Sequence, residues 1–305
     1  MIDYKKILVW RPVAVMIGLS RRITLPGFEG IPLYDVTVFF IRGLTKGYIT
    51  HRAAAISFSF FMAIFPFLIF LFTIIPFIPV TNFQQTLLDL VSQFLPGSAY
   101  ETVKETIVDI VTRPRSSLLI LNLLLTLYFS TNGVNSLIEA FNNTTHTFET
   151  RSMVKQYLIS ILLVCIQSFL LIIAIGLMSF GTGLLQLLLP EFIAGSGFFV
   201  YILQFLKWLV ALGALLLAIS FLYYLAPAHQ AHFRFISAGS LLATFLVIVS
   251  TLGFNYYVDN FSRYNALYGS LGTLMIVLVW IYINAISLLI GFELNASIHT
   301  AKEHP

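Results

Sequence analysis

Few side chains in this 305-residue sequence could bind a metal or perform catalysis. The stretch H-Q-A-H places His229 and His232 at a metal-like spacing, but it follows Pro227 in a short loop without a nearby acidic ligand. Cys165 is the single cysteine and lies in an apolar run, so no disulfide or C-x-x-C redox pair can form within the chain. The sequence has no G-x-S-x-G, H-E-x-x-H or phosphate-binding glycine motif. We therefore expect no catalytic residue, no metal site, no cofactor and no enzymatic activity.

Glu293 is the most informative carboxylate. The stretch from Tyr264 to Phe292 carries no charged side chain, and Glu293 follows it directly. A carboxylate at the C-terminal end of a helix opposes the helix dipole, so it should have a compensating partner. Arg52, before the first apolar run, and Arg234, before the fifth, are expected at a similar depth. A structural ion pair is favoured, and a gate for a cation or a substrate and a chemical role are the alternatives.

Lys207, in the stretch L-Q-F-L-K-W-L-V, is the one basic residue inside an apolar run. A lysine at the centre of a membrane costs about 2.5–3.5 kcal/mol on insertion scales. Its helical face also holds Gln204 and Ala211, small or polar residues that suit contact with other helices. Two interpretations stay open: the ammonium reaches the nearby membrane surface, or it lines an internal cavity and binds an anionic group.

Polar side chains also form stripes along other apolar runs. Asn132, Asn135, Glu139 and Asn142 follow the spacing i, i+3, i+7 and i+10 on one helical face, and Asn284 belongs to a similar stripe in the last run. Such stripes most often pack against other helices, and a polar-lined cavity is the alternative. The candidate cavity or gate residues are Lys207, Asn132, Asn135, Glu139, Asn284 and Glu293.

The composition predicts an all-α membrane protein with several spans. Hydrophobic residues make up 58% of the chain and charged residues only 10%, well below the roughly 25% typical of soluble domains. Six apolar runs are long enough to cross the hydrocarbon core, which needs about 20 helical residues. The expected spans are Ala53–Pro79, Ser117–Leu137, Tyr157–Leu189, Phe198–Ala226, Phe235–Val258 and Tyr268–Phe292.

Three parts of the chain are expected: residues 1–52, a membrane domain over 53–297, and a short tail over 298–305. In the first part, Tyr34, Val38, Ile41 and Tyr48 share a face, which indicates either a helix in the membrane interface or an ordinary packed helix. Residues 80–116 contain two amphipathic patterns typical of short helices. Pro66 should kink or break the first span, because it has no N–H to donate.

Basic residues predict the orientation, because cytoplasmic flanks of membrane spans are rich in lysine and arginine. With both termini in the cytoplasm, that side holds Lys5, Lys6, Arg11, Arg21, Arg22, Arg42, Lys46, Arg52, Arg151, Lys155, Arg234 and Lys302. The other side holds Lys104, Arg113, Arg115 and Arg263. The basic excess is thus explained by topology and by anionic lipid, and nucleic acid is not an expected partner.

Three stretches carry a resemblance to a known family. R-A-A-A-I-S-F-S-F-F-M-A-I-F-P-F-L-I-F-L, E-A-F-N-N-T-T-H-T-F-E-T-R and Y-G-S-L-G-T-L-M-I-V-L-V-W-I-Y-I-N-A-I-S-L-L-I-G-F-E-L-N-A resemble the opening, middle and closing signatures of the YihY/virulence factor BrkB family. The resemblance covers about Val36–Ser297. The motif positions that match are Ala53, Ala54, Pro66, Tyr268, Gly269, Ser270, Gly272, Glu293, Leu294, Asn295 and Ala296.

The resemblance implies a bacterial inner-membrane protein with six helices and no catalytic residues that could be assigned. Members were formerly labelled ribonuclease BN, a label regarded as a misassignment, and others are linked to serum resistance and to lipopolysaccharide-precursor export. We therefore expect transport or export of a lipid or an anionic solute, with the lipid bilayer as the main partner. An envelope assembly or resistance factor without transport is the alternative, a membrane-bound hydrolase or nuclease is the third function considered, and a homo-oligomer stays open.

Overall fold

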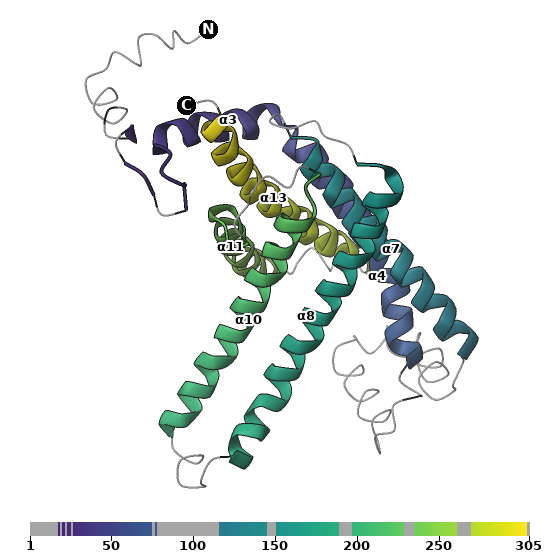
Figure 1. The fold of residues 1–305 in the computed structure, drawn as a ribbon. Coiled ribbons are helices and arrows are strands. Elements are labelled where there is room, and N and C mark those ends of the chain that lie inside the picture. The colour runs from purple at the N-terminus through teal and green to yellow at the C-terminus, as the bar shows by residue number, and fades with distance from the viewer. Residues whose placement is uncertain are drawn as a thin grey trace. The chain divides into compact units, whose positions relative to one another are not determined.

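The structure, a computed structural model, describes residues 18, 20–21, 23–25, 27–74, 77, 116–144, 151–188, 197–228, 235–260 and 270–303. These residues form seven α-helices and no β-strand, which confirms the predicted all-α class (Figure 1). Within them, six helices are long and apolar enough to cross a membrane. The two short amphipathic helices expected within residues 80–116 would lie before Ser116, outside the described residues.

The six long helices match the six predicted spans. They are α4 (Ile49–Ile74), α7 (Ser116–Asn142), α8 (Met153–Leu188), α10 (Gly197–Leu225), α11 (Ala238–Asn260) and α13 (Ser270–Glu303). Most ends agree with the prediction within one or two turns, but α13 continues about three turns beyond Phe292. The placement of Glu293 at a helix end was therefore wrong, and the expected tail over 298–305 is helical as far as Glu303.

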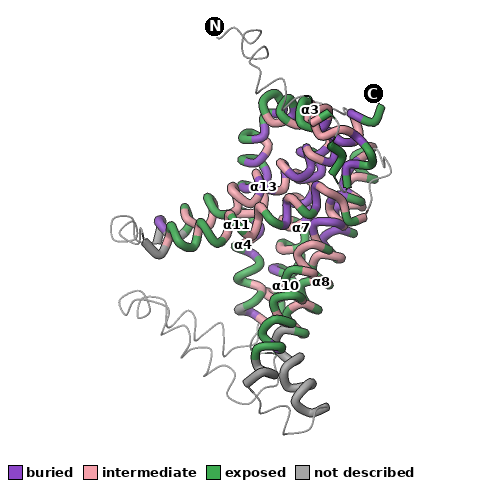
Figure 2. Tube along the Cα trace, turned by 90° about the vertical axis from the view of Figure 1, so that its left-hand side faces the viewer, coloured by how far each residue is buried: buried purple, intermediate pink, exposed green. Residues whose placement is uncertain are grey.

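The surfaces of these helices suit contact with lipid. Ile172 on α8 is 68% exposed, Phe205 on α10 is 69% exposed, and Phe245 on α11 is 62% exposed. Where their burial is described, exposed residues outnumber buried ones on α8 and α10, whereas buried residues gather along α13 (Figure 2). Large apolar side chains exposed along whole helices are not expected on a water-soluble protein, and they agree with a membrane domain.

The chain divides into two compact units, one of residues Phe58–Gly133 and the other of Met1–Ser57 with Val134–Pro305. In the first unit, buried polar side chains bond to their own helix, as Thr73 does to the carbonyl of Ile69 and Asn122 to that of Leu118. Pro66 lies inside α4, which continues on both sides of it, so the break considered from the sequence is absent. The second unit holds all the contacts described below.

The predicted juxtamembrane helix is present as α3 (Leu33–Lys46). Pro32 precedes its first turn and Gly47 follows its last, and Asp35 and Lys46 lie at the ends where the helix dipole favours their charges. The face expected from the sequence is not the packed face: Val38 and Ile41 are exposed, while Val36 and Gly43 are buried. The helix therefore packs through one face and leaves Val38 and Ile41 uncovered on another, and its location in the membrane interface stays a prediction.

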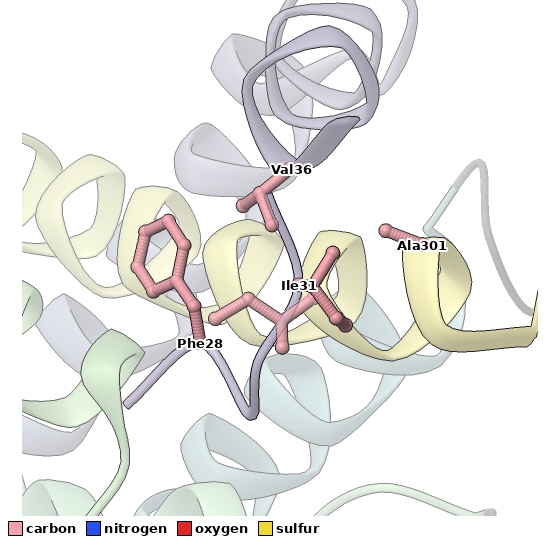
Figure 3. Close-up of a cluster of buried hydrophobic side chains, with 5 residues drawn as sticks. Phe28, Ile31, Val36 and Ala301 are labelled. Carbon is pink, nitrogen blue, oxygen red and sulfur yellow. The ribbon is translucent and has the colours of Figure 1, made fainter. Parts of the chain in front are cut away.

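The packed face of α3 meets the last turns of α13. Phe28, Ile31 and Val36 form a buried cluster with Ile298 and Ala301 (Figure 3). The side chain of Lys302 adds an ion pair to Glu29 at 2.6 Å on the surface. These contacts explain why α13 stays helical after Glu293, since Ile298 and Ala301 lose contact with water only as part of this cluster.

Close packing joins the other helices of this unit. The rings of Phe141 on α7 and Phe292 on α13 stack at 4.2 Å between centroids, and Tyr223 on α10 meets both edge-on. The Tyr223 hydroxyl donates to the carbonyl of Leu288 at 2.5 Å. One aromatic contact thus joins α7, α10 and α13, close to the C-terminal ends of α7 and α10.

Candidate functional site

Hydrogen bonds within the second unit link the helix ends to one another. Arg52, in the first turn of α4, contacts Glu293, which lies about three turns before the end of α13. The same helix also reaches the start of α11 through Asn295. Asn142 at the end of α7 and Arg151 just before α8 both contact the end of α10 or the residues that follow it. These contacts therefore involve one end each of α4, α7, α8, α10 and α11, together with residues of α13 about three turns before its end. We call the residues that make these contacts the polar collar: Arg52, Asn142, Arg151, Ser237, Glu293 and Asn295.

Asn295 of the polar collar completes the start of α11. Its amide oxygen accepts from the N–H of Gly239 at 2.8 Å, and its amide nitrogen donates to the Ser237 hydroxyl at 2.7 Å. Ser237 and Ser240 also bond to each other's backbone N–H groups. The first N–H groups of a helix have no partner within the helix, so these side chains satisfy them. This arrangement gives the Asn295 position of the family motif a structural role.

Arg151 and Asn142 complete the end of α10 in the same way. The Arg151 guanidinium donates to the carbonyl oxygens of Leu225 and Pro227, and the Asn142 amide oxygen accepts from the N–H of Ala228 at 2.8 Å. Carbonyls at a helix end lack partners within the helix, and the negative end of the helix dipole favours a cation there. Burial lowers the pKa of Arg151 from its usual value.

The ion pair of Arg52 and Glu293 confirms one of the two partners expected from the sequence. Arg52 Nη1 donates to Glu293 Oε1 at 2.8 Å and to the carbonyl of Gly47 at 2.9 Å. The Glu293 side chain is fully buried and that of Arg52 is 10% exposed. Three further atoms of the pair are buried and have no hydrogen-bond partner in the described structure: Arg52 Nε, Arg52 Nη2 and Glu293 Oε2.

A second polar group joins α7 to α8. Gln156 donates to the amide oxygen of Asn135 at 2.8 Å, and the Asn135 amide nitrogen donates to Glu139 Oε1 at 2.8 Å. Asn132 lies one turn earlier on α7 and is half-buried. Gln156 was not among the candidates predicted from the sequence, although Gln156, Ser160 and Gln167 recur on one face of α8 and could have indicated it. Ser160 is fully buried, and Gln167 donates to the carbonyl of Ala218 on α10 at 2.9 Å.

The remaining candidate residues do not contact the Arg52–Glu293 pair in the described structure. Asn284 donates to the carbonyl of Trp280 in its own helix, and its amide oxygen is buried without a described partner. Asn284 and Glu293 are nine positions apart on α13, which places them on opposite faces of a helix with 3.6 residues per turn. No described contact joins either of them to Asn135, Glu139 or Lys207.

Lys207 lies far along α10 from the polar collar. It precedes the end of the helix at Leu225 by eighteen positions, a distance of about 27 Å at 1.5 Å per residue. The same spacing separates the start of α11 at Ala238 from Tyr256, which is 73% exposed. Since tyrosine and tryptophan favour membrane interfaces and Trp208 is 67% exposed beside Lys207, this geometry favours the opposite membrane surface.

Lys207→Met is therefore expected to fold normally and to restore the phenotype of a deletion strain as well as the unchanged protein does. The ammonium then contributes only an interfacial charge, and Lys207→Arg should be silent as well. Detergent stability and complementation at equal expression measure the two effects. A stable Lys207→Met protein that fails to complement would assign Lys207 to an internal anion-binding cavity.

The other motif positions serve packing where the structure describes them. Ala53 is fully buried, Ala296 and Gly272 are buried, and Leu294 packs against the cluster of α3 and α13. Ala54 is exposed, Pro66 is buried within α4, and Ser270 begins α13. Tyr268, Gly269, Arg234 and both histidines of H-Q-A-H lie outside the described residues. Among the described residues, no group of three or more histidine, cysteine or acidic side chains could hold a metal ion.

These features define a helical membrane protein with six candidate spans, whose helix ends are joined by a polar collar containing a buried ion pair. Residues 40–305 match the Virulence factor BrkB family, and the chain belongs to that family. Its membership confirms the resemblance drawn from the three sequence stretches.

Curated relatives align over most of the chain. The ribonuclease-like protein YfkH of Bacillus subtilis is 30% identical over 271 residues, which are 87% of this chain and 97% of YfkH. A UPF0761 membrane protein of Alteromonas mediterranea is 28% identical over 276 residues, with 89% and 90% of the two chains covered. A UPF0761 membrane protein of Xanthomonas axonopodis is 26% identical over 280 residues, 88% of this chain and 63% of the relative. No solved structure matches this chain.

Proposed function

We propose that this protein transports a lipid or an anionic solute across the bacterial inner membrane. The observation that carries the proposal is the open side of the Arg52–Glu293 pair, where two guanidinium nitrogens and one carboxylate oxygen are buried without a partner in the described structure. Buried charges in membrane domains are costly, and they commonly mark the path of a substrate or an ion. A pair with unused donors can bind an anionic group without first breaking its own contact.

The proposed orientation places the polar collar at the cytoplasmic surface with both termini inside the cell. Among the described residues, the basic side chains at or beyond this end of the spans are Arg21, Arg42, Lys46, Arg52, Arg151, Lys155 and Lys302. This distribution supports a cytoplasmic location, because basic flanks stay on that side during insertion. The open side of Arg52 would then meet a substrate that comes from the cytoplasm or the inner leaflet.

Cysteine labelling in intact cells tests this orientation. The native Cys165 is exposed on α8 and is first replaced by serine, so that the added cysteine is the only one. In that background, a membrane-impermeant reagent should label Ser98→Cys from outside and should label Ser20→Cys only after the cells are opened. The opposite pattern would show that the polar collar faces outward and would overturn the cytoplasmic entry route.

The transport proposal is tested by depletion. Depleting the protein should leave an anionic lipid or solute enriched on the cytoplasmic side, as measured by mass spectrometry of the two leaflets and of the cytoplasm. The unchanged protein should reverse this enrichment and Arg52→Lys should not, because lysine keeps the charge but lacks the planar set of donors. Arg42→Gln removes an exposed cation of α3 and is the matched control, which should reverse it fully.

The same experiment separates transport from its alternative. An unchanged distribution of all anionic lipids and solutes, together with a weakened envelope, would favour the assembly or resistance role without transport.

We also propose that the protein is not an enzyme. Hydrolysis of RNA by the pure protein with a divalent metal, lost in a His229→Ala/His232→Ala double variant, would overturn this part of the proposal.

A further inference from the structure

The unpartnered atoms of the Arg52–Glu293 pair define the chemistry of the group that could bind there. Arg52 uses only Nη1 in its two hydrogen bonds. Its Nε and Nη2 atoms form one edge of the guanidinium, with two N–H groups that can bind two oxygens of a single anion. Glu293 Oε2 lies on the same ion pair and can only accept a hydrogen bond while the carboxylate is ionised. A ligand that satisfies all three atoms must present two acceptors and one donor.

This requirement distinguishes between classes of anion. A carboxylate, a sulfate and a phosphodiester all offer acceptor oxygens to Arg52, but none carries a proton to donate to Glu293. A phosphate monoester with one proton offers oxygens to the arginine and an O–H group to the carboxylate. Its second ionisation lies near pH 6 in free solution, and the adjacent negative charge of Glu293 favours retention of that proton.

The surroundings of the pair bring a backbone loop and a positive charge close to it. A side-chain carbon added at Gly47 would lie 3.3 Å from Arg52 Nη1, 3.4 Å from Glu293 Oε1 and only 2.3 Å from the carbonyl of Gly43. Glycine at position 47 therefore lets the loop between α3 and α4 lie close to the two atoms that already bond to each other, Arg52 Nη1 and Glu293 Oε1. The exposed side chain of Lys46, the last residue of α3, adds positive charge just before this loop.

We propose that the open side of the Arg52–Glu293 pair binds a singly protonated phosphate monoester. The inference deepens the proposed transport function by naming the substrate's charged group, and it rests on that function only for the expectation that the ligand is moved. The same phosphate chemistry could be presented by a lipid head group or by a soluble phosphate, and the experiment has an arm for each source.

The lipid arm uses the full-length protein in nanodiscs of phosphatidylcholine with equal small fractions of phosphatidic acid, a monoester, and phosphatidylmethanol, a diester whose head group has no hydrogen-bond donor. Native mass spectrometry of the protein released from the nanodiscs should show phosphatidic acid retained about tenfold over phosphatidylmethanol, because one additional hydrogen bond to a charged group is gained. Arg52→Lys should reduce this preference to near one, and Arg42→Gln should leave it unchanged.

The soluble arm compares inorganic phosphate with sulfate on the unchanged protein in neutral detergent, so it does not depend on whether an Arg52 variant folds. Phosphate should raise the thermal unfolding temperature at about a tenth of the concentration that sulfate requires, since sulfate has no proton to donate to Glu293. Preference for phosphate without a preference for phosphatidic acid would support the site and assign it to soluble phosphates.

Equal effects of phosphate and sulfate, together with equal retention of the two lipids, would overturn the proposal. Such a result would mean that the open atoms bind water only. A third result is also informative. If the protein binds with the expected preferences but its depletion changes no lipid or solute distribution, only the proposed transport function is contradicted. The two failures are therefore distinguishable.

Discussion

Gly239→Ala is expected to prevent stable folding, although alanine is the better helix former. An added Cβ at Gly239 would lie 2.2 Å from the carbonyl oxygen of Gly291 and 2.5 Å from Asn295 Oδ1. The first of these atoms is backbone, so a rotated side chain cannot relieve the clash. Helices α11 and α13 would have to separate, and the hydrogen bond from Gly239 to Asn295 would be lost with them. Overpacking costs about 1–3 kcal/mol where side chains can adjust, and we expect the upper end or more here.

Gly291→Ala should have a comparable effect from the other side of the same contact. Its Cβ would lie 2.6 Å from Ala243 Cβ, 2.6 Å from the carbonyl oxygen of Gly239 and 2.7 Å from the Tyr223 hydroxyl. We expect both variants to lose most of the folded protein that elutes as a single species from detergent extracts. The matched control is Gly253→Ala on α11, where nothing lies within 4 Å of the added carbon.

Gly253→Ala should fold at least as well as the unchanged protein, because alanine is favoured over glycine within a helix by about 1 kcal/mol. Normal yield and thermal stability of Gly239→Ala and Gly291→Ala would show that α11 and α13 do not approach as closely as described. Equal loss in all three variants would indicate a general sensitivity of glycine positions in these helices.

The sequence could predict the six helices because each apolar run is long enough to cross the membrane, a property of local composition alone. It could not predict where α13 ends. His299, Lys302 and Glu303 follow the run and indicate a polar tail. The helix continues because Ile298 and Ala301 pack against Phe28, Ile31 and Val36, residues more than two hundred positions away. Contacts at that separation leave no local pattern.

The packed face of α3 was missed for a related reason. Helical periodicity identifies an apolar face, but this helix has one face toward lipid or solvent and another toward α13. Val38 and Ile41, on the face identified from the sequence, are 39% and 54% exposed, while Val36 is 1% exposed. Near a membrane, an apolar face need not be a packed face, so periodicity alone cannot choose between them.

The candidate site was predictable in part. Opposition to the helix dipole predicted a partner for Glu293, with Arg52 and Arg234 as the two candidates, and the structure confirms the ion pair with Arg52. Glu293 lies inside α13 and not at its end, so the predicted position was wrong, and the burial of Glu293 supplies the need for a partner instead. The roles of Asn295 and Arg151 could not be predicted, since each completes the end of a different helix. Which helix ends meet depends on the packing of the whole unit.

The ion pair itself provides the second large expected effect. Arg52→Met alone should leave the buried Glu293 carboxylate without its partner, and Glu293→Met alone should leave the guanidinium unpaired. Removing one member of a buried pair typically costs about 3–5 kcal/mol, because the other charge stays in an apolar environment. Each single variant should therefore unfold at a clearly lower temperature in detergent and yield less folded protein.

The double variant Arg52→Met/Glu293→Met separates a structural role from a functional one. Two apolar side chains of similar volume replace both charges, so its stability should return most of the way to that of the unchanged protein. If the pair serves only to hold α4 against α13, this variant should also complement a deletion strain. We expect a stable protein that does not complement, because the open guanidinium edge and the free carboxylate oxygen are both gone. Full complementation by the double variant would restrict the pair to holding the helices together and would remove the observation on which the proposed transport rests.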